Sequence, residues 1–103
     1  MPHKPIHPGE VLRDELDGLN MNAAELARAI NVPANRISQI LTGKRNISAD
    51  TALRLGKLFG TGPQFWLNLQ TAYELDLARA GGNGPDLSAI IPLATEMRAP
   101  VNP

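Results

Sequence analysis

Apolar positions recur at helical spacing through most of the chain, and no useful stretch alternates in the manner of a β-strand. Between residues 10 and 80, apolar side chains fall three or four positions apart, the period of an amphipathic helix. Turn and capping residues divide this region into segments joined by short turns. The sequence therefore predicts an all-α domain of five helices, over residues 11–19, 23–30, 33–42, 49–59 and 63–80.

Residues with known capping preferences support these boundaries. Asn22 followed by Glu25 has the capping-box pattern, and Ser48 is suited to cap the fourth helix. Gly60 is suited to end that helix, and Pro63 suits the first turn of the fifth. The domain organisation predicted is an N-terminal arm over 1–8, a helical domain over 9–80 and a tail over 81–103, with Gly81-Gly82 closing the last helix.

Two helical faces are expected to build much of the core. The first helix has one face with four apolar residues, and the fifth has a longer face that holds most of the aromatic residues. The aromatic residues of the fifth helix are predicted to lie in the core and not to form a surface that stacks on bases. The two predicted faces are Val11, Leu12, Leu16 and Leu19, and then Phe65, Trp66, Leu69, Ala72, Tyr73 and Leu77.

Residues 26–40 have the pattern of a helix-turn-helix. Small or apolar residues occupy the positions where two crossed helices meet, and Asn31 occupies the turn, where a left-handed backbone is needed. An αα-hairpin without a role in DNA binding is the alternative for this pattern. The apolar positions are Leu26, Ala27, Ile30, Val32, Ile37 and Ile40.

Charge is unevenly distributed along a chain that is neutral as a whole. The 103 residues contain 10 Lys+Arg and 10 Asp+Glu. The middle of the chain is basic, with Asp50 as its one acid, whereas the first helix is acidic. Two surfaces of opposite sign suit two different partners, although any single basic residue is as well explained as ordinary solvated charge. The basic residues are Arg28, Arg36, Lys44, Arg45, Arg54 and Lys57.

The outer face of the third predicted helix is polar and short. Amide side chains there can pair with adenine in the major groove, and arginine prefers guanine. Basic residues just after the helix are placed to meet phosphates. The predicted DNA-binding residues are Asn35, Arg36, Ser38, Gln39, Thr42, Lys44 and Arg45.

Five sequence blocks give the chain a family resemblance. HPGE at 7–10, LARAINVP, RISQILTGKRNIS, ADTALRL at 49–55 and FGTGPQFWLNLQTAYEL at 59–75 together resemble the HigA-type antitoxins of the Xre/Cro-like helix-turn-helix class. The resemblance runs from His7 to about Ala78 and excludes the tail. Asn31 departs from the family's usual turn glycine, and Gly62 from a common serine.

The resemblance implies a lambda-repressor-like, five-helix DNA-binding domain that forms a homodimer on double-stranded operator DNA. It also implies a cognate toxin partner, a HigB-type RNase of RelE-like fold that cleaves mRNA, and repression of the shared operon. Two other hypotheses stay open. One is a stand-alone repressor of the same fold without a toxin, and the other is a module that binds only protein.

Candidate surfaces for the two protein partners lie on the fifth and first helices. Leu67, Leu75 and Ala78 are apolar and are expected to lie opposite the core-facing side, which predicts a dimer interface, although scattered exposed leucines are common. The acidic first helix is the predicted toxin-binding surface. Acids in a first turn also stabilise a helix through its dipole, which is the alternative explanation. The candidate toxin-binding residues are Glu10, Asp14 and Asp17.

The sequence does not indicate a metal site, a catalytic site or a membrane span. The chain has no cysteine, and prolines separate His3 from His7, so no metal site and no cofactor is expected. No catalytic motif indicates an enzyme. No apolar run approaches the roughly 20 residues of a membrane span, which predicts a cytoplasmic protein. Residues 81–103 are expected to form a flexible linker followed by a weakly docking apolar segment over 86–94.

Overall fold

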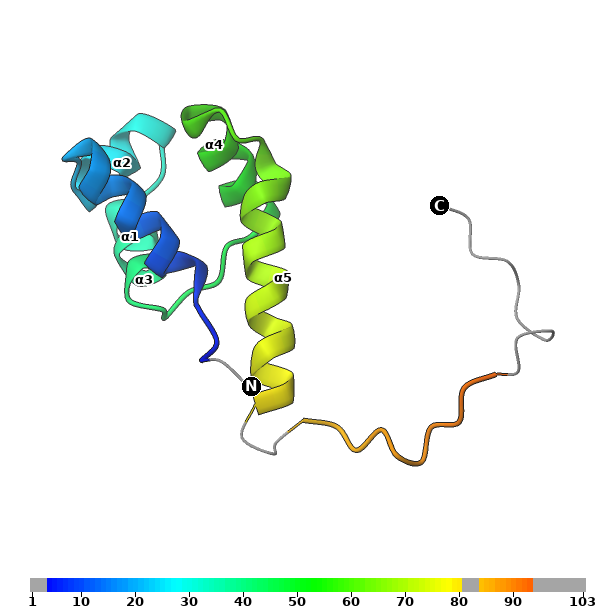
Figure 1. Ribbon diagram of the computed structural model, residues 1–103. Coiled ribbons are helices and arrows are strands. Elements are labelled where there is room, and N and C mark those ends of the chain that lie inside the picture. Colours follow the sequence, from blue (N-terminus) through cyan, green and yellow to red (C-terminus); the bar gives the residue numbers. More distant parts are fainter. Residues whose placement is uncertain (1–3, 81–83, 94–103) are drawn as a thin grey trace.

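The computed structural model of the protein describes residues 4–80 and 84–93, and within them it contains five α-helices and no strand. The first four helices form a compact group, and the longest helix runs down one side of it (Figure 1). The all-α prediction is thus confirmed, with five helices in the described part of the chain. They are α1 Pro8–Leu19, α2 Ala23–Ile30, α3 Ala34–Leu41, α4 Ala49–Phe59 and α5 Pro63–Arg79.

The first helix begins at Pro8, three residues earlier than the sequence predicts, because His7 caps it. The His7 Nδ1 atom accepts a hydrogen bond from the Gly9 backbone N–H at 2.9 Å. The Glu10 carboxylate in turn accepts from the His7 backbone N–H at 3.3 Å. Histidine is not among the usual capping residues, so the sequence pattern alone did not indicate this start.

The remaining helix boundaries follow the capping chemistry closely. Asn22 Oδ1 accepts from the Glu25 N–H at 2.8 Å and Glu25 Oε1 accepts from the Asn22 N–H at 2.9 Å, which is a complete capping box. Ser48 caps α4, and Gly60 ends it in the left-handed conformation with φ 73°. Gly81 and Gly82, expected to close the last helix, lie outside the described residues, and α5 ends at Arg79.

The core is built from aliphatic side chains of every helix around one tryptophan. Trp66 of α5 is fully buried and packs against Phe59 in a tilted arrangement and against Phe65 edge-to-face, at centroid distances of 5.7 and 5.1 Å. The residues predicted to form the apolar contacts of the helix-turn-helix lie in this core. Val32 is the exception, because it is only partly buried. Its buried apolar members are Leu12, Leu16, Leu26, Ala27, Ile30, Ile37, Ile40, Ile47, Ala52, Leu55 and Trp66.

Several predicted core residues are instead exposed. Leu19 is 55% exposed because it is the last residue of α1. Leu77 is 48% exposed because the lower part of α5 extends past the other helices (Figure 1). Phe65 is 41% exposed, and Ala72 is also exposed, since both lie about 100° or more around α5 from Trp66.

The fifth helix also buries a polar residue that the apolar pattern did not include. Gln70 is only 5% exposed and lies on the same face as Trp66 and Tyr73. Leu67, predicted to lie on the outer side, is partly buried and packs against the core. The buried face of α5 is therefore turned toward Leu67 and Gln70, away from Phe65 and Ala72.

The described part of the tail has neither helix nor strand. Gly84 lies against the end of α5, since a Cβ atom there would come within 1.9 Å of the Ala78 carbonyl oxygen. Beyond it, apolar side chains are largely solvent-exposed as the chain runs away from the helices (Figure 1). The expected linker falls partly in residues 81–83, outside the described range. The exposed side chains are Leu87, Ile90, Ile91 and Leu93, at 61–84%.

In residues 4–80 and 84–93, none of the helices has both the length and the apolar character needed to cross a membrane.

One close helix contact yields a stability prediction. Gly56 of α4 packs so closely on the following turn that a Cβ atom would lie 2.3 Å from the Gly62 carbonyl carbon. Gly56→Ala is expected to lower the free energy of unfolding by about 2–3 kcal/mol. Gly18→Ala is the control: nothing lies within 4 Å of a Cβ there, so alanine should stabilise α1 by about 0.5–1 kcal/mol. Urea denaturation of the two variants measures both values, and a stable Gly56→Ala protein would contradict the contact.

Candidate nucleic-acid interface

The turn between α2 and α3 has the backbone conformation that a helix-turn-helix requires. Asn31 adopts the left-handed conformation with φ 60° and ψ 51°, as predicted from its position. The Val32 N–H donates to the Ala27 carbonyl at 2.9 Å, a bond that closes the end of α2 and turns the chain. The α3 helix then packs across α2 through Ile37 and Ile40, and its opposite face is left to solvent.

A shared carboxylate links this turn to α3 and α4. Asp50 Oδ2 accepts from Arg36 at 2.9 Å and from Arg54 at 3.0 Å. The other end of the Arg54 guanidinium donates to the carbonyls of Ile30 at 2.9 Å and Asn31 at 3.3 Å. Arg54 therefore caps the C-terminus of α2, where a positive charge is favourable.

These contacts involve Arg36, a predicted DNA-binding residue, and Arg54, a further residue of the basic segment. The Arg54 and Arg36 hydrogen bonds hold the pKa of the Asp50 carboxyl below its usual value, so it stays ionised and partly neutralises both arginines. Asp50 and Arg54 are four residues apart on α4, whereas the bond from Arg54 to α2 depends on the tertiary fold. Arg36 therefore orients α3 in addition to facing solvent.

The outer face of α3 holds the predicted base-reading residues, and three of them are exposed. Asn35, Ser38 and Thr42 lie on the solvent side. The Ser38 hydroxyl donates to the Ala34 carbonyl at 3.1 Å, and the Thr42 hydroxyl donates to the Ser38 carbonyl at 3.0 Å. Both hydroxyl oxygens keep lone pairs to accept hydrogen bonds from base edges.

Gln39 and Arg45 form a connected pair at the end of this face. Arg45 Nε donates to Gln39 Oε1 at 2.9 Å. This bond holds the amide in one orientation and leaves its NH₂ group directed away from the arginine, able to donate to a base. Lys44 and Arg45 are exposed in the turn that follows α3, as phosphate-contacting residues must be.

The α3–α4 loop that carries these basic residues is anchored from α5. Gln70 Oε1 accepts from the Ile47 backbone N–H at 2.8 Å, and its Nε2 donates to Glu74 at 2.9 Å. The sequence did not single out Gln70, although its position four residues after Trp66 and three before Tyr73 gave a signal. A polar residue at a buried helical position usually has a specific partner.

His7 approaches the same loop from the start of α1. Its ring packs edge-on against Tyr73 with centroids 4.9 Å apart and is only 6% exposed. Burial lowers the pKa of the His7 imidazole below 6.5, and the Arg45 backbone carbonyl and the Glu10 carboxylate partly offset this effect. From the sequence His7 was considered only as a metal ligand paired with His3, and that pairing was set aside; His3 lies outside the described residues.

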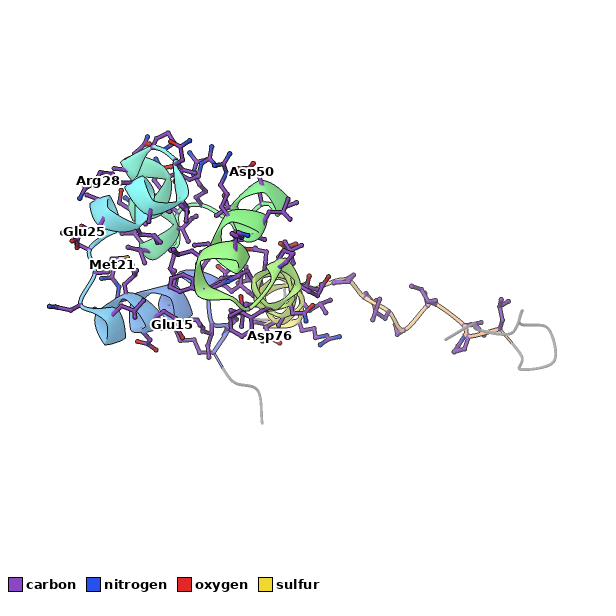
Figure 2. All side chains as sticks on the ribbon, turned by 90° about the horizontal axis from the view of Figure 1, so that it is seen from above. Glu15, Met21, Glu25, Arg28, Asp50 and Asp76 are labelled. Carbon is purple, nitrogen blue, oxygen red and sulfur yellow. The ribbon has the colours of Figure 1, made fainter. Side chains whose placement is uncertain are left out.

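Acidic side chains lie on more than one side of the domain. In Figure 2, Glu15 of α1 projects on the side of the domain opposite to Asp50, which neighbours the helix-turn-helix. The predicted toxin-binding residues Glu10, Asp14 and Asp17 are exposed along α1. Within the described residues, no three histidine or acidic side chains gather closely enough to hold a metal ion.

The residues predicted for a dimer interface separate into two groups. Leu75 and Ala78 are exposed near the end of α5, where they line a hollow with Gly84 and Leu87. Leu67 packs against the core and is not part of this surface. A second apolar hollow between α2 and α4 is lined by Ala29, Leu53 and Leu58 among others.

The fold and this surface define a helix-turn-helix protein, and comparison with known families agrees. The Helix-turn-helix family matches residues 12–66. A relative named Virulence-associated protein I, from Dichelobacter nodosus, is 47% identical over 94 residues, which cover 90% of this chain and 85% of that protein. The chain belongs to the helix-turn-helix family, and within it to the HigA antitoxin type that its sequence resembles; its relatives are not enzymes.

Two solved structures of HigA proteins are similar to this chain. An addiction module antidote protein of the HigA family from Coxiella burnetii is 56% identical, with a TM-score of 0.73 over 74% of this chain and 84% of that one. The antitoxin HigA of Pseudomonas aeruginosa, solved with the higBA promoter, is 51% identical, with a TM-score of 0.71 over 73% of this chain and 83% of that one.

The buried imidazole predicts how stability depends on pH. Since folding lowers the pKa of His7 below 6.5, the unfolded chain binds more protons near that pH. The contribution is fully present above pH 6.5 and is lost as pH falls through the folded-state value, by up to about 1.4 kcal/mol per unit of pKa difference.

The test compares wild type with His7→Asn, which keeps a capping acceptor but does not titrate. Urea denaturation between pH 5 and pH 8 should show a steeper loss of stability in acid for wild type. If the free energy of unfolding depends on pH in the same way in both proteins, burial does not lower the pKa of His7.

Proposed function

We propose that the chain is an antitoxin that represses its own operon as a DNA-bound dimer and neutralises a HigB-type, RelE-like mRNA-cleaving toxin in the bacterial cytoplasm. The observation that carries the DNA part is the exposed polar face of α3, continued by Lys44 and Arg45 and backed by the Gln39–Arg45 hydrogen bond. The Pseudomonas aeruginosa relative, solved with its promoter, supports operator DNA as the ligand.

In this proposal α3 enters the major groove. Asn35, Ser38, Gln39 and Thr42 face base edges, whereas Lys44 and Arg45 contact phosphates on either side of the groove. Arg36 stays close to Asp50 and orients the helix. Arg45 would then join the two kinds of contact, since it touches Gln39 and a phosphate together.

The DNA prediction separates base reading from phosphate contact. Gln39→Ala should cost about 1–3 kcal/mol of operator affinity and relax the preference at one base pair. Arg45→Ala should weaken operator and random duplexes alike and lower the salt dependence by about one charge. Titration of the DNA directly upstream of the gene, with a random duplex as reference, measures both. Unchanged operator affinity of Gln39→Ala would rule out this docking.

A dimer is expected because one helix-turn-helix reads few base pairs, and two half-sites lie about 34 Å apart on one face of DNA. Leu75 and Ala78 are the exposed apolar residues that we propose for the interface on α5. Leu67 is left out because it packs on the core, so its replacement would destabilise the monomer.

The dimer prediction uses a leucine of similar exposure as its control. Leu75 is 47% exposed on α5 and Leu53 is 60% exposed on α4. A Leu75→Glu, Ala78→Glu double variant should sediment as a monomer, while Leu53→Glu should remain a dimer. The opposite result would move the interface to the hollow between α2 and α4.

The acidic side of α1 supports the toxin part of the proposal. RNases that bind RNA are expected to be basic, and complementary charge speeds association more than it deepens affinity. Glu10, Asp14 and Asp17 are exposed on α1, and Asp17 lines a hollow together with Ser38 and Thr42, so one end of this acidic surface borders the proposed DNA-binding face. Apolar contacts by Ile6, which is 52% exposed, would supply affinity beside these charges.

The toxin prediction reverses this charge. Asp14→Lys with Asp17→Lys should slow association with the protein encoded by the adjacent gene by about tenfold at low salt, and by much less at high salt. Asp86→Lys reverses an exposed acid outside α1 and is the control of the same sign. Stopped-flow association gives the rates, and a rate indifferent to both charge and salt would place the toxin interface elsewhere.

A stand-alone repressor without a toxin is the second candidate. It would keep the DNA contacts of α3 and lose only the role of α1. Coexpression with the neighbouring small open reading frame distinguishes the two, because only an antitoxin restores growth when that protein is induced.

A further inference from the structure

One buried amide holds the far end of the loop between α3 and α4. Gln70 of α5 is only 5% exposed, and its Oε1 atom accepts from the Ile47 backbone N–H at 2.8 Å, across 23 positions of the chain. Ile47 directly precedes Ser48, the cap of α4, and it follows the exposed residues Lys44 and Arg45. The loop that carries these two basic residues is therefore tied to α5 at the point where it enters α4.

The near end of the same loop is held by α3. The Lys44 N–H donates to the Gln39 carbonyl at 2.8 Å, and Arg45 Nε donates to the Gln39 side chain at 2.9 Å. The Ile47 side chain is 3% exposed, so apolar burial keeps the far end against the core with or without the amide. The bond from Gln70 therefore fixes the direction of the peptide group before Ile47, and with it the path of the loop between its two ends.

Glu74 sets the orientation of the Gln70 amide. A glutamine amide accepts through its oxygen and donates through its nitrogen, so only the oxygen can pair with the Ile47 N–H. The Gln70 Nε2 atom donates to Glu74 Oε2 at 2.9 Å, and an ionised carboxylate accepts hydrogen bonds without donating any. Turning the amide over would place two donors together at Ile47 and two acceptors together at Glu74. The carboxylate therefore selects the orientation in which Oε1 meets the loop.

We propose that Glu74 is a positioning residue for DNA binding, because through Gln70 it fixes the loop from which Lys44 and Arg45 meet phosphates. Glu74 is exposed on α5 and is an acid, so by charge alone it would oppose DNA. Its contribution is the acceptor that it offers to the amide. The inference rests on the proposed DNA-binding function and adds to it a residue outside the helix-turn-helix.

The sign of the effect separates this role of Glu74 from two simpler ones. If Glu74 acted only through its charge, its removal would tighten DNA binding. If its bond to Gln70 served only the fold, its removal would lower the free energy of unfolding and leave the affinity of the folded protein unchanged. Positioning of the loop instead predicts weaker DNA binding by a folded protein that has lost one negative charge.

The test compares Glu74→Ala with Glu74→Gln. Both variants lose the same charge, but the glutamine keeps an oxygen that accepts from Gln70 Nε2. Binding is measured across salt concentrations on a duplex from directly upstream of the gene, and urea denaturation establishes that both proteins are folded. Glu74→Ala should bind about fivefold more weakly than Glu74→Gln, with a slope of log affinity against log salt up to about 0.9 shallower, the value of one phosphate contact.

Two further variants locate the effect. Glu15→Ala removes an exposed acid of α1 and is the charge control, which should bind at least as tightly as wild type. When Lys44→Ala and Arg45→Ala are introduced together, adding Glu74→Ala or Glu74→Gln should give equal affinities, because the contacts that Glu74 positions are then absent.

Hydrogen exchange of the Ile47 amide tests the first step without DNA. This amide should exchange at least about fivefold faster in Glu74→Ala than in Glu74→Gln, because the Gln70 amide then samples both orientations. The Ala52 amide donates to the Ser48 carbonyl at 2.8 Å and is the reference, which should exchange at the same rate in both variants.

Three results overturn the inference in distinguishable ways. Equal affinity and equal salt slope for Glu74→Ala and Glu74→Gln would leave Glu74 without a role in DNA binding. Equal exchange of the Ile47 amide in the two variants would mean that Glu74 does not orient Gln70. If wild type binds neither the upstream duplex nor a random one, the proposed DNA-binding function itself fails, whereas the exchange measurement still reports on the link between Glu74 and the loop.

Discussion

The closure of α2 at Asn31 is the constraint on which the rest of the domain depends. A left-handed residue ends the helix and reverses the chain, and Arg54 then ties the freed carbonyls of Ile30 and Asn31 to α4. Because Arg54 also meets Asp50, and Asp50 meets Arg36, the same group of charges sets the rotation of α3. The side chains on the outer face of α3 are oriented by contacts made behind them.

Features governed by neighbouring residues were predictable from the sequence. The helical period predicted the five helices, and the Asn22–Glu25 spacing predicted a capping box. The position of Asn31 predicted the left-handed turn. The predicted start of the first helix at Val11 was wrong, because the His7 imidazole caps the helix and it begins at Pro8. The outer face of α3 was likewise predictable, since its orientation follows once Ile37 and Ile40 are buried.

Features that depend on residues distant in the sequence were not predictable from it. Gln70 interrupts the apolar pattern of α5 because its side chain accepts a hydrogen bond from the backbone N–H of Ile47, which lies in the loop between α3 and α4. His7 gave no usable signal because its neighbours Tyr73 and Arg45 come from two other parts of the chain. Leu67 and Phe65 were assigned to the wrong sides of α5, since the apolar pattern of that helix leaves the direction of its buried face ambiguous.

The ring contact between His7 and Tyr73 has a consequence for how the domain forms. Helices adjacent in sequence pack as α2 with α3 and as α4 with α5, and such local pairs assemble quickly. The contact of α1 with α5 joins nearly the two ends of the domain, so it closes the largest loop. During synthesis α1 to α4 can pack before α5 is complete, and at that stage the loop between α3 and α4 lacks its bond to Gln70 while His7 lacks its contact with Tyr73.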